Sequence, residues 1–412
     1  MAETLGITHR IWRQIPAPLR RAALGAALRA WVPRPNPIPP ASSDGAHIAG
    51  ELGRISGLGE AARLLHRGLV DLHADAGAIE LAIGHRPIRR PPPSANKQAS
   101  PSQASALILH VNAPSIPLLL ARAPRDFLRN RRVIGFWNWE IETLPIAWRR
   151  NADLVHEAWA PTRFTATALE TIMPGRVRVV PYPLADFLIP AVADRAALNV
   201  PERTVIITVI ANLGASFARK NPLGAIGAFR AAFGDRPDRL LLLKLAGASL
   251  FPQDLAQIHA AIGDAANIRL IDATWSAAQM RSLLASTDIL LSMHRAEGFG
   301  LVPAEAMLRG IPVIATGWSG NMQFMDAQSA ALLPYRLVPV IEQRGDYAVP
   351  GARWAEPDAD ACVEALRRLA DDPEARQALA ARGQAYARAA LTLEPLAAAL
   401  HANGIHPLTP LN

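Results

Sequence analysis

The sequence predicts an α/β fold with two Rossmann-like domains, each built on a parallel sheet. Short apolar segments that suit buried parallel strands alternate with segments whose apolar residues recur at helical spacing. The length of 412 residues suits two or three domains, and a hydrophobic composition of 50% is enough to form proper cores. Residues 181–199 contain three prolines and are predicted to be the interdomain hinge. We place the first domain at residues 46–190 and the second at residues 200–384.

A basic extension, residues 1–45, precedes the first predicted strand. Six arginines lie in the first 34 residues against a single acid, Glu3. Together with the apolar residues between them, they fit one or two amphipathic helices lying on an anionic membrane. A helix docked on the protein's own surface and a disordered tail are the alternatives. The net charge is +8, but no nucleic-acid-binding motif accompanies it, so we expect no nucleic-acid partner.

Cysteine content and hydropathy favour the cytoplasm. The single cysteine, Cys362, excludes an internal disulfide framework and fits a reducing compartment. No apolar run reaches about 18 residues, the length that indicates a membrane-spanning helix. The beginning of the chain also lacks the continuous apolar core of a secretory signal. We therefore expect a cytoplasmic protein, located at the inner face of the membrane if the basic extension binds lipid.

The first domain is predicted to alternate strands with helices. Ala46–Glu51 is the first strand, Gly53–Gly59 a glycine-containing turn, and Glu60–Leu72 a helix. The turn does not match the dinucleotide-binding fingerprint, so NAD binding is not supported. The other elements predicted here are the strands Ala76–Ala82, Ala106–Val111, Val133–Glu140, Leu154–Ala160 and Val177–Val180, the exposed loop Arg86–Ser105 and the helix Pro161–Ile172.

The second domain repeats this alternation. Its predicted strands are Thr204–Ala211, Leu240–Ala246, Ile268–Ile271, Asp288–Leu291 and Ile311–Ala315, and its predicted helices are Leu223–Phe233, Ser276–Ala285, Ala304–Arg309 and Ala359–Asp371. Tyr347 and the segment Trp354–Asp358 are predicted to lead into the last of these helices. Helical segments rich in alanine then continue from Pro373 to Ala402.

The stretch Ser292–Asn321 carries the strongest functional signal. It follows a predicted buried strand, and Pro303 suits the first turn of the helix that comes next. In a strand-loop-helix unit of this kind, free backbone N–H groups and the positive end of the helix face the crevice above the sheet, where a phosphate is held best. Glu297 lies on the loop and Glu305 at the start of the helix. Carboxylates are strong hydrogen-bond acceptors for sugar hydroxyls.

The runs EGFG, PAEAM and GIPVIAT in this stretch resemble the signature of the GT4 family, also called glycosyl transferases group 1. The resemblance covers residues 46–390 and implies the GT-B fold, in which two Rossmann-like domains face each other across a cleft. It also implies that residues 385–412 contain a helix that crosses back to the first domain. By position, Glu297 would contact the hydroxyls of the donor sugar and Glu305 the ribose of the nucleotide. The backbone that would meet the diphosphate belongs to Gly298, Phe299, Gly300, Leu301 and Val302.

The same resemblance implies roles for a second glycine loop and for two basic residues. Gly57 and Gly59 would lie beside the acceptor and the diphosphate. Lys220 matches a family lysine that neutralises the leaving phosphate as the glycosidic bond breaks. The family arginine that usually precedes this lysine is replaced here by small residues, so the adjacent Arg219 is the candidate to substitute for it.

Five residues at the C-terminal ends of two predicted strands are expected to line the acceptor side. His110 and Asn112 follow one strand, and Trp137, Trp139 and Glu140 follow the next. The histidine that many GT4 enzymes carry after the second strand is missing, and Glu140 is our catalytic candidate there. His110 could instead be a satisfied polar group at the sheet edge, and the tryptophans could be core residues rather than platforms for a sugar ring.

These expectations combine into one preferred function with two alternatives. We expect a retaining glycosyltransferase that needs no metal and no cofactor and uses a nucleoside diphosphate sugar, such as GDP-mannose or a UDP-hexose. Its acceptor would be a glycan or a lipid-linked molecule in surface polysaccharide synthesis. A phosphorylase or synthase of the same fold is the enzymatic alternative. The other is a catalytically weak or inactive scaffold that binds a glycan or a protein partner.

Overall fold

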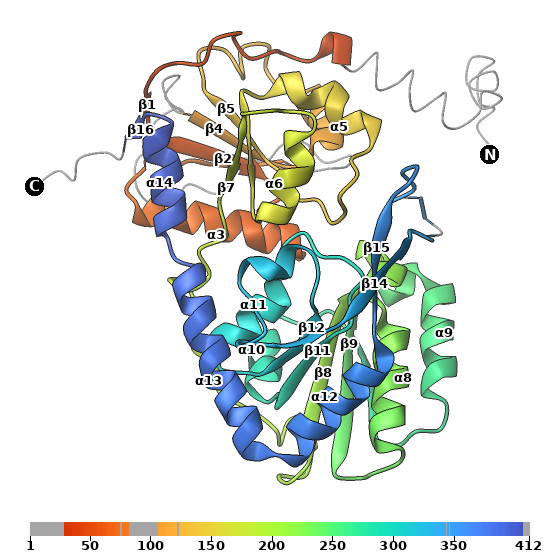
Figure 1. Ribbon diagram of the computed structural model, residues 1–412. Coiled ribbons are helices and arrows are strands. Elements are labelled where there is room, and N and C mark those ends of the chain that lie inside the picture. The colour runs from red at the N-terminus through yellow and green to blue at the C-terminus, as the bar shows by residue number, and fades with distance from the viewer. Residues whose placement is uncertain are drawn as a thin grey trace, which may run out of the picture.

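The computed structural model describes residues 29–74, 76–81, 106–121, 123–342, 344–345 and 347–406. The start of the predicted amphipathic extension, up to residue 28, and the predicted loop Arg86–Ser105 lie outside the described residues. Two α/β domains lie one above the other, and each is built around a parallel sheet (Figure 1). The predicted pair of Rossmann-like domains is therefore confirmed.

The N-terminal domain contains, in its described part, a six-stranded parallel sheet of order β3-β2-β4-β5-β6-β7. The strands are β2 (Ala46–Gly50), β3 (Ala78–Glu80), β4 (Ala106–His110), β5 (Val133–Phe136), β6 (Glu157–Ala160) and β7 (Val177–Val179). The helices are α3 (Gly57–Asp71), α4 (Ile116–Leu120), α5 (Ile146–Asn151) and α6 (Arg163–Glu170), with short 3-10 turns at Ala113–Ser115 and Ala152–Leu154. The central strands β2 and β4 are buried along their whole length, as expected for a sheet covered on both faces.

The C-terminal domain has a second parallel sheet, whose described strands follow the order β10-β9-β8-β11-β12-β13. The strands are β8 (Val205–Asn212), β9 (Arg239–Ala246), β10 (Ile268–Asp272), β11 (Ile289–Ser292), β12 (Val313–Thr316) and β13 (Ala331–Leu333). The helices are α7 (Phe217–Lys220), α8 (Pro222–Phe233), α9 (Pro252–Ile262), α10 (Ala277–Ala285), α11 (Leu301–Leu308) and α12 (Ala359–Asp371), with 3-10 turns at Leu213–Ala215, Ala248–Leu250 and Gly320–Gln323.

A β-hairpin that the sequence did not indicate follows this sheet. Its antiparallel strands are β14 (Tyr335–Pro339) and β15 (Arg353–Pro357), and it projects from the C-terminal domain toward the N-terminal domain (Figure 1). The helix predicted at Ala359–Asp371 is present as α12, and the segment Trp354–Asp358 that was predicted to lead into it begins within strand β15. Tyr347 and Trp354 are buried in an apolar cluster that also contains Trp139 and Trp148 of the N-terminal domain. The hairpin therefore packs across the domain boundary.

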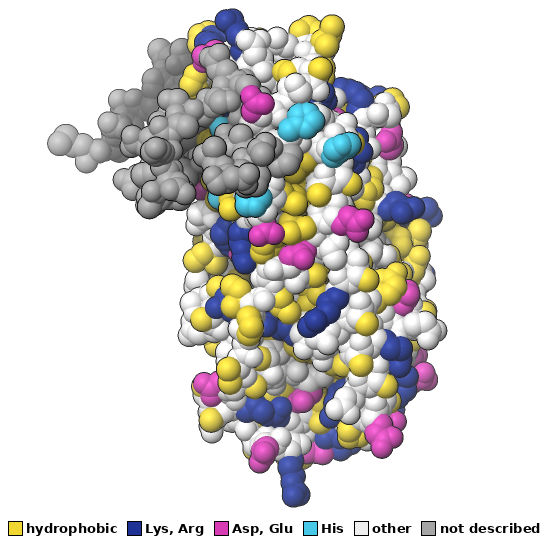
Figure 2. Space-filling model, turned by 90° about the vertical axis from the view of Figure 1, so that its left-hand side faces the viewer, with side chains coloured by type: hydrophobic (Ala, Val, Ile, Leu, Met, Phe, Trp, Pro, Cys, Tyr) yellow, Lys and Arg dark blue, Asp and Glu magenta, His cyan; other side chains and the backbone are white. Residues whose placement is uncertain are grey.

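The end of the chain returns to the N-terminal domain. Helix α13 (Pro373–Ala390) runs along the C-terminal domain and α14 (Glu394–Ala402) lies against the N-terminal one (Figure 1). Beyond it, β16 (Ile405–His406) pairs in parallel with β1 (Ser43–Asp44). Figure 2 views the molecule from the side of α13 and α14, where basic, acidic and apolar side chains are interspersed. None of the helices in the described part of the chain combines the length and the apolar character that crossing a membrane requires.

Candidate active site

Glu297 lies at the centre of a buried group of charges. It occupies the loop between β11 and α11, and its side chain is only 9% exposed. Lys220 forms an ion pair with one carboxylate oxygen, and Nη1 of Arg219 lies 3.3 Å from the other. Burial alone would raise the pKa of Glu297, but the Lys220 and Arg219 charges lower it to about 2. Glu297 is therefore a carboxylate at every pH at which the protein is expected to work.

The two cations come from one short helix with an unusual backbone on both sides. Helix α7 ends in Arg219 and Lys220, and the residues that flank it, Ser216 and Asn221, have φ values of 71° and 51°. The hydrogen bonds of their side chains offset part of this strain. The Ser216 hydroxyl accepts from the Arg219 amide, and the Asn221 side-chain oxygen accepts from the Gly224 amide. The strained caps direct both cations to Glu297. Arg219 thus lies in direct contact with Glu297.

Glu140 joins the same group from the N-terminal domain. Its carboxylate lies 3.8 Å from Nη2 of Arg219 and accepts a hydrogen bond from Tyr347 in the hairpin loop. The pKa of Glu140 is raised, chiefly by burial and further by the negative charge of Glu297. Arg219, Tyr347 and Lys220 oppose this rise. The predicted catalytic residues from both domains, Glu140, Arg219, Lys220 and Glu297, are thus brought together.

The glycine loop after Glu297 contacts the N-terminal domain directly. The Gly298 carbonyl accepts from the Thr162 hydroxyl at 3.0 Å, and a Cβ on Gly298 would lie 3.3 Å from the Trp139 carbonyl oxygen. Gly300 has a φ of 96° and precedes α11, so it makes the turn that an L side chain would strain. Leu301 and Val302 then form the first turn of α11, whose first amides lack partners within the helix.

Phe299 connects the loop to the core of both domains. It is 4% exposed, and its ring centroid lies 5.0 Å from that of Tyr182 and 5.1 Å from that of Phe324. Its side chain is thus a packing element, which leaves only its backbone for contact with a ligand.

The second glycine loop is part of a helix rather than a free turn. Gly57 and Gly59 are in the first turn of α3, because the Ser56 hydroxyl caps this helix by accepting from the Gly59 amide at 3.1 Å. A Cβ on Gly59 would lie 2.2 Å from the Arg54 carbonyl oxygen, so this position needs glycine. Gly57 faces the other domain, where a Cβ would lie 3.7 Å from the Leu301 side chain. The start of α3 therefore opposes the start of α11.

Glu305 lies one turn further along α11, outside the buried charge group. Its side chain is 33% exposed, and one oxygen accepts from Nη2 of Arg309 at 2.8 Å. Its second oxygen makes no hydrogen bond to the part of the chain that the structure describes. Glu305 can therefore accept a ribose hydroxyl without breaking its pair with Arg309.

His110 belongs to a buried polar chain beneath the predicted acceptor side. Its Nε2 lies 3.1 Å from the Tyr182 hydroxyl, which donates to the Asn138 side-chain oxygen at 2.9 Å. The Asn112 side-chain oxygen in turn accepts from the Asn138 amide at 2.8 Å. Burial lowers the pKa of His110 to about 4, so its ring is neutral at pH 7. This series of hydrogen bonds holds the loop that ends in Glu140.

The two predicted tryptophans pack in the interior. Trp137 has no exposed surface and contacts Trp148 at a centroid distance of 5.8 Å. Trp139 is 6% exposed, packs against Tyr347 at 5.3 Å and donates through its indole N–H to the Thr143 carbonyl. Trp137 therefore offers no face to a sugar, and Trp139 supports the hairpin loop.

Sequence reasoning missed three groups of residues around Glu297. Ser319 has a φ of 82° and accepts from the Glu297 amide at 2.8 Å, and the Gly320 amide donates to the Glu297 carbonyl at 2.8 Å. Thr162 and Thr165 bond the loop from the N-terminal domain, and Tyr347 bonds Glu140. The glycine-containing turn Trp318–Asn321 was a usable signal for the first group. Nothing local indicated the others, because their partners are remote in sequence.

A metal-binding cluster is not evident within the described ranges, where no group of three or more His, Cys, Asp or Glu side chains could hold an ion. The positive charge near Glu297 comes from Arg219 and Lys220.

Known proteins resemble this chain in sequence family and in fold. A family model described as family 4 glycosyltransferase in conflict systems (GT4-conflict) matches residues 178–400. No curated protein matches the chain. HepE from Anabaena, solved with UDP and glucose, has a TM-score of 0.63 and 16% identity, and the match covers 87% of this chain and 99% of HepE.

Two other solved structures resemble the chain. A glycosyltransferase from Rickettsia africae has a TM-score of 0.64 and 14% identity, over 87% of this chain and 98% of its own. A variant of TarM from S. aureus, solved with fondaparinux, alpha-GlcNAc-glycerol and UDP, has a TM-score of 0.51 and 12% identity. That match covers 73% of this chain and spans 56% of TarM. These likenesses show the GT-B fold and confirm the predicted fold class.

The family match includes both basic residues of α7, the loop with Glu297, and helix α11. It spans more than half of the chain. The chain therefore belongs to the family 4 glycosyltransferases in conflict systems and is a GT4-type glycosyltransferase.

Proposed function

We propose that this glycosyltransferase transfers a hexose from a nucleoside diphosphate sugar, with retention of the anomeric configuration, to a hydroxyl of a glycan or lipid-linked acceptor. One observation carries the proposal: Glu297 is ion-paired to Lys220 and Arg219 directly before the glycine loop and the start of α11. A carboxylate for sugar hydroxyls, two cations and free helix amides for a diphosphate thus lie within one loop-helix unit.

Donor binding would redistribute the charges of this group. The diphosphate takes a share of the two cations, which leaves the Glu297 carboxylate to accept hydrogen bonds from the donor sugar. Glu305 accepts from the ribose through its free oxygen. These contacts with the donor stabilise the donor-bound state relative to the empty site.

The proposed reaction takes place on one face of the sugar. The bond between the anomeric carbon and the diphosphate oxygen breaks, and the acceptor oxygen forms a bond to the same face of that carbon. The acceptor proton passes to the leaving phosphate oxygen. Arg219 and Lys220 stabilise the negative charge that grows on that phosphate, and the ionised Glu140 faces the positive charge that develops on the sugar.

A UDP-hexose is the donor we place first. HepE, which has the same fold and is covered by the match over 99% of its chain, was solved with UDP and glucose, and the TarM variant was solved with UDP. GDP-mannose is the second candidate. The acceptor we favour is a growing surface polysaccharide or its lipid-linked precursor.

The test is donor turnover across a panel of UDP- and GDP-sugars with wild type, Lys220→Ala and Glu305→Ala. We expect one donor to be hydrolysed or transferred. Lys220→Ala should lower kcat by about 100-fold and change KM less, because the phosphate charge grows in the transition state. Glu305→Ala should mainly raise KM.

Glu364→Ala on the exposed face of α12 is the matched control and should behave as wild type. Equal effects of Lys220→Ala on kcat and donor affinity would contradict the role of Lys220. Silence across the panel, with no thermal shift from UDP or GDP, would instead favour a scaffold that binds a glycan or a partner.

A further inference from the structure

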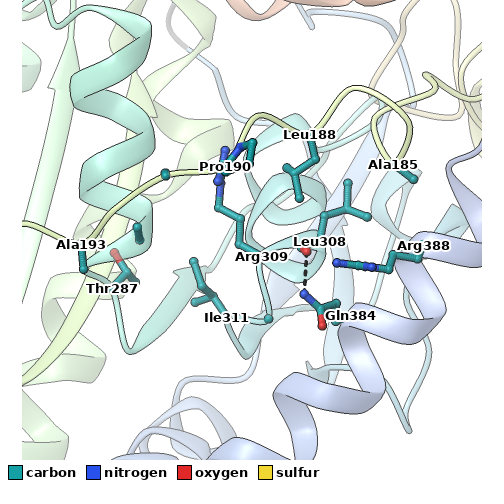
Figure 3. Close-up of a pocket in the computed structure, with 13 residues that line it drawn as sticks. Ala185, Leu188, Pro190, Ala193, Thr287, Leu308, Arg309, Ile311, Gln384 and Arg388 are labelled. Carbon is teal, nitrogen blue, oxygen red and sulfur yellow. Dashed lines mark hydrogen bonds between the residues drawn. The ribbon is translucent and has the colours of Figure 1, made fainter.

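A separate pocket lies at the hinge between the domains. It has a volume of about 710 Å³ and is lined by the interdomain linker, the ends of α10 and α11, and α13. Figure 3 shows linker residues Leu188 and Pro190 on one side and Gln384 and Arg388 of α13 on the other. The predicted catalytic and nucleotide-sugar residues do not line it. Its walls thus include both chain segments that cross from one domain to the other.

The charge on this pocket has one sign. Arg309 and Arg388 line it, and there is no Asp or Glu among its 13 described lining residues. Arg388 is exposed and makes no hydrogen bond or ion pair with the described residues. Two cations without a lining acid favour an anion, and the guanidinium group matches the geometry of phosphate oxygens.

Arg309 also has one N–H group without a hydrogen-bond acceptor among the described residues. Its side chain is only 7% exposed, and its Nε is buried without a hydrogen-bond partner among the described residues. A buried donor of this kind costs free energy as long as it has no acceptor. Apolar lining residues, including Leu188, Pro190, Leu308 and Ile311, supply a surface for an organic part of the ligand.

We propose that this hinge pocket binds a small phosphate-bearing organic molecule between Arg309 and Arg388. A phosphate is favoured over a carboxylate because it has more oxygens and can accept hydrogen bonds from two guanidinium groups at once. The site is distinct from the donor site, since the cations of the donor site are Arg219 and Lys220.

The pocket is connected to the donor site through Arg309. Its Nη1 donates to the Ile189 carbonyl of the linker at 3.1 Å, and its Nη2 donates to Glu305 at 2.8 Å. A phosphate that attracts this guanidinium weakens its hold on both partners. Ligand binding would therefore change the linker and the ribose contact together, and the two sites would be coupled reciprocally. This coupling rests on the proposed function, whereas the binding site does not.

The binding test uses phenyl phosphate as the probe and calorimetry as the measurement. Lys220→Ala is the background, because it weakens any phosphate binding at the donor site. In this background we expect phenyl phosphate to bind and benzoate to bind more weakly. Adding Arg388→Ala should weaken phenyl phosphate binding by about tenfold, the loss expected for one charge-assisted hydrogen bond. Adding Arg382→Ala instead, on the same helix but outside the pocket, should change nothing.

Equal binding with and without Arg388→Ala, or no binding of phenyl phosphate to the Lys220→Ala background, would overturn the site. The coupling is tested in the wild type, where phenyl phosphate should change the KM for the donor, and this change should disappear in Arg388→Ala. An unchanged KM would refute the coupling. If no donor turns over, the calorimetry still decides the pocket, so failure of the proposed function and failure of this proposal are distinguishable.

Discussion

Arg219 lies between the carboxylates of both domains, Glu297 at 3.3 Å and Glu140 at 3.8 Å. Burial of three charges would be costly for any one of them alone, and each is stabilised by the others. The two acids respond in opposite directions, since the pKa of Glu297 is lowered and that of Glu140 is raised. Glu297 faces two cations directly, whereas Glu140 is further from both. Of these two acids, Glu140 is therefore the one that gains a proton first as the pH falls.

Burial raises the pKa of Glu140, and the hydroxyl of Tyr347 is one of the groups that oppose this rise. Its hydrogen bond lowers the pKa of Glu140 against the effects of burial and of Glu297, and Arg219 and Lys220 act in the same direction as Tyr347. In Tyr347→Phe this pKa should rise further. Because the proposed reaction needs ionised Glu140, the acid limb of the kcat/KM profile should then move to higher pH.

The measurement is donor turnover against pH for wild type, Tyr347→Phe and Glu140→Gln. Glu140→Gln should abolish the acid limb that belongs to this carboxyl. Tyr386→Phe on α13 is the control, because it removes a hydroxyl far from the site and should leave the profile unchanged. An acid limb at the same pH in Tyr347→Phe and wild type would show that Tyr347 has only a packing role.

The sequence predicted the surroundings of some site residues but not those of others. Glu297, Lys220 and Arg219 could be predicted because the first lies in a recognisable motif and the others precede a helix in the same domain. The environment of Glu140 could not, since its partner Tyr347 comes from a hairpin of the other domain. The burial of Trp137 was also hidden, because it follows from packing against Trp148 rather than from its own position after β5.

At the scale of elements, the turn after β12 holds the Glu297 loop in shape. The Gly320 amide donates to the Glu297 carbonyl, and a Cβ on Gly320 would lie 2.2 Å from the Gly298 carbonyl oxygen. The added Cβ and the Gly298 carbonyl oxygen are both held in place by the backbone, so a rotamer change cannot relieve the clash. The turn and the loop must approach through glycine.

We therefore expect Gly320→Ala to destabilise the protein by about 1–3 kcal/mol, the usual cost of overpacking, and to reduce turnover strongly. Urea unfolding and donor turnover are the measurements. Gly227→Ala in the middle of α8 is the matched control, since nothing lies within 4 Å of the added Cβ. It should stabilise the protein by about 0.4–1 kcal/mol. A Gly320→Ala protein with wild-type stability would show that the loop can shift without cost.

Regular elements were predictable where the pattern is local. The apolar runs of β8 and β9 and the periodic helices could be read from neighbouring residues. The start of α3 was placed too late because Ser56, which caps it, precedes three residues in which two are glycine. The β14–β15 hairpin was missed because its strands contain prolines and exposed residues, and its burial depends on Trp139 and Arg295, which are distant in sequence.

At the scale of the whole molecule, the last helix is part of the N-terminal core. Leu396 of α14 is fully buried, and its Cδ2 would lie 2.7 Å from a Cβ on Gly68 of α3. Leu396→Ala should therefore cost about 2–5 kcal/mol, through lost burial and a cavity. The loss should appear as faster hydrogen exchange in α3.

Leu250→Ala is the matched control, because Leu250 is 76% exposed and its loss should stay within about 0.5 kcal/mol. Exchange in α3 at the wild-type rate in Leu396→Ala would show that α14 is an appendage rather than a part of that core.

The pairing of β16 with β1 has a consequence for how the protein is made. Ser43 pairs with Ile405, and Leu396 completes a cluster that begins with Ala46 and Ile48. On the ribosome, the N-terminal domain is synthesised first, but its core lacks α14 until residues 394–402 emerge. The N-terminal domain therefore stays partly folded while the C-terminal domain is translated and folds. A chain that stops before α14 therefore leaves the core of the N-terminal domain incomplete.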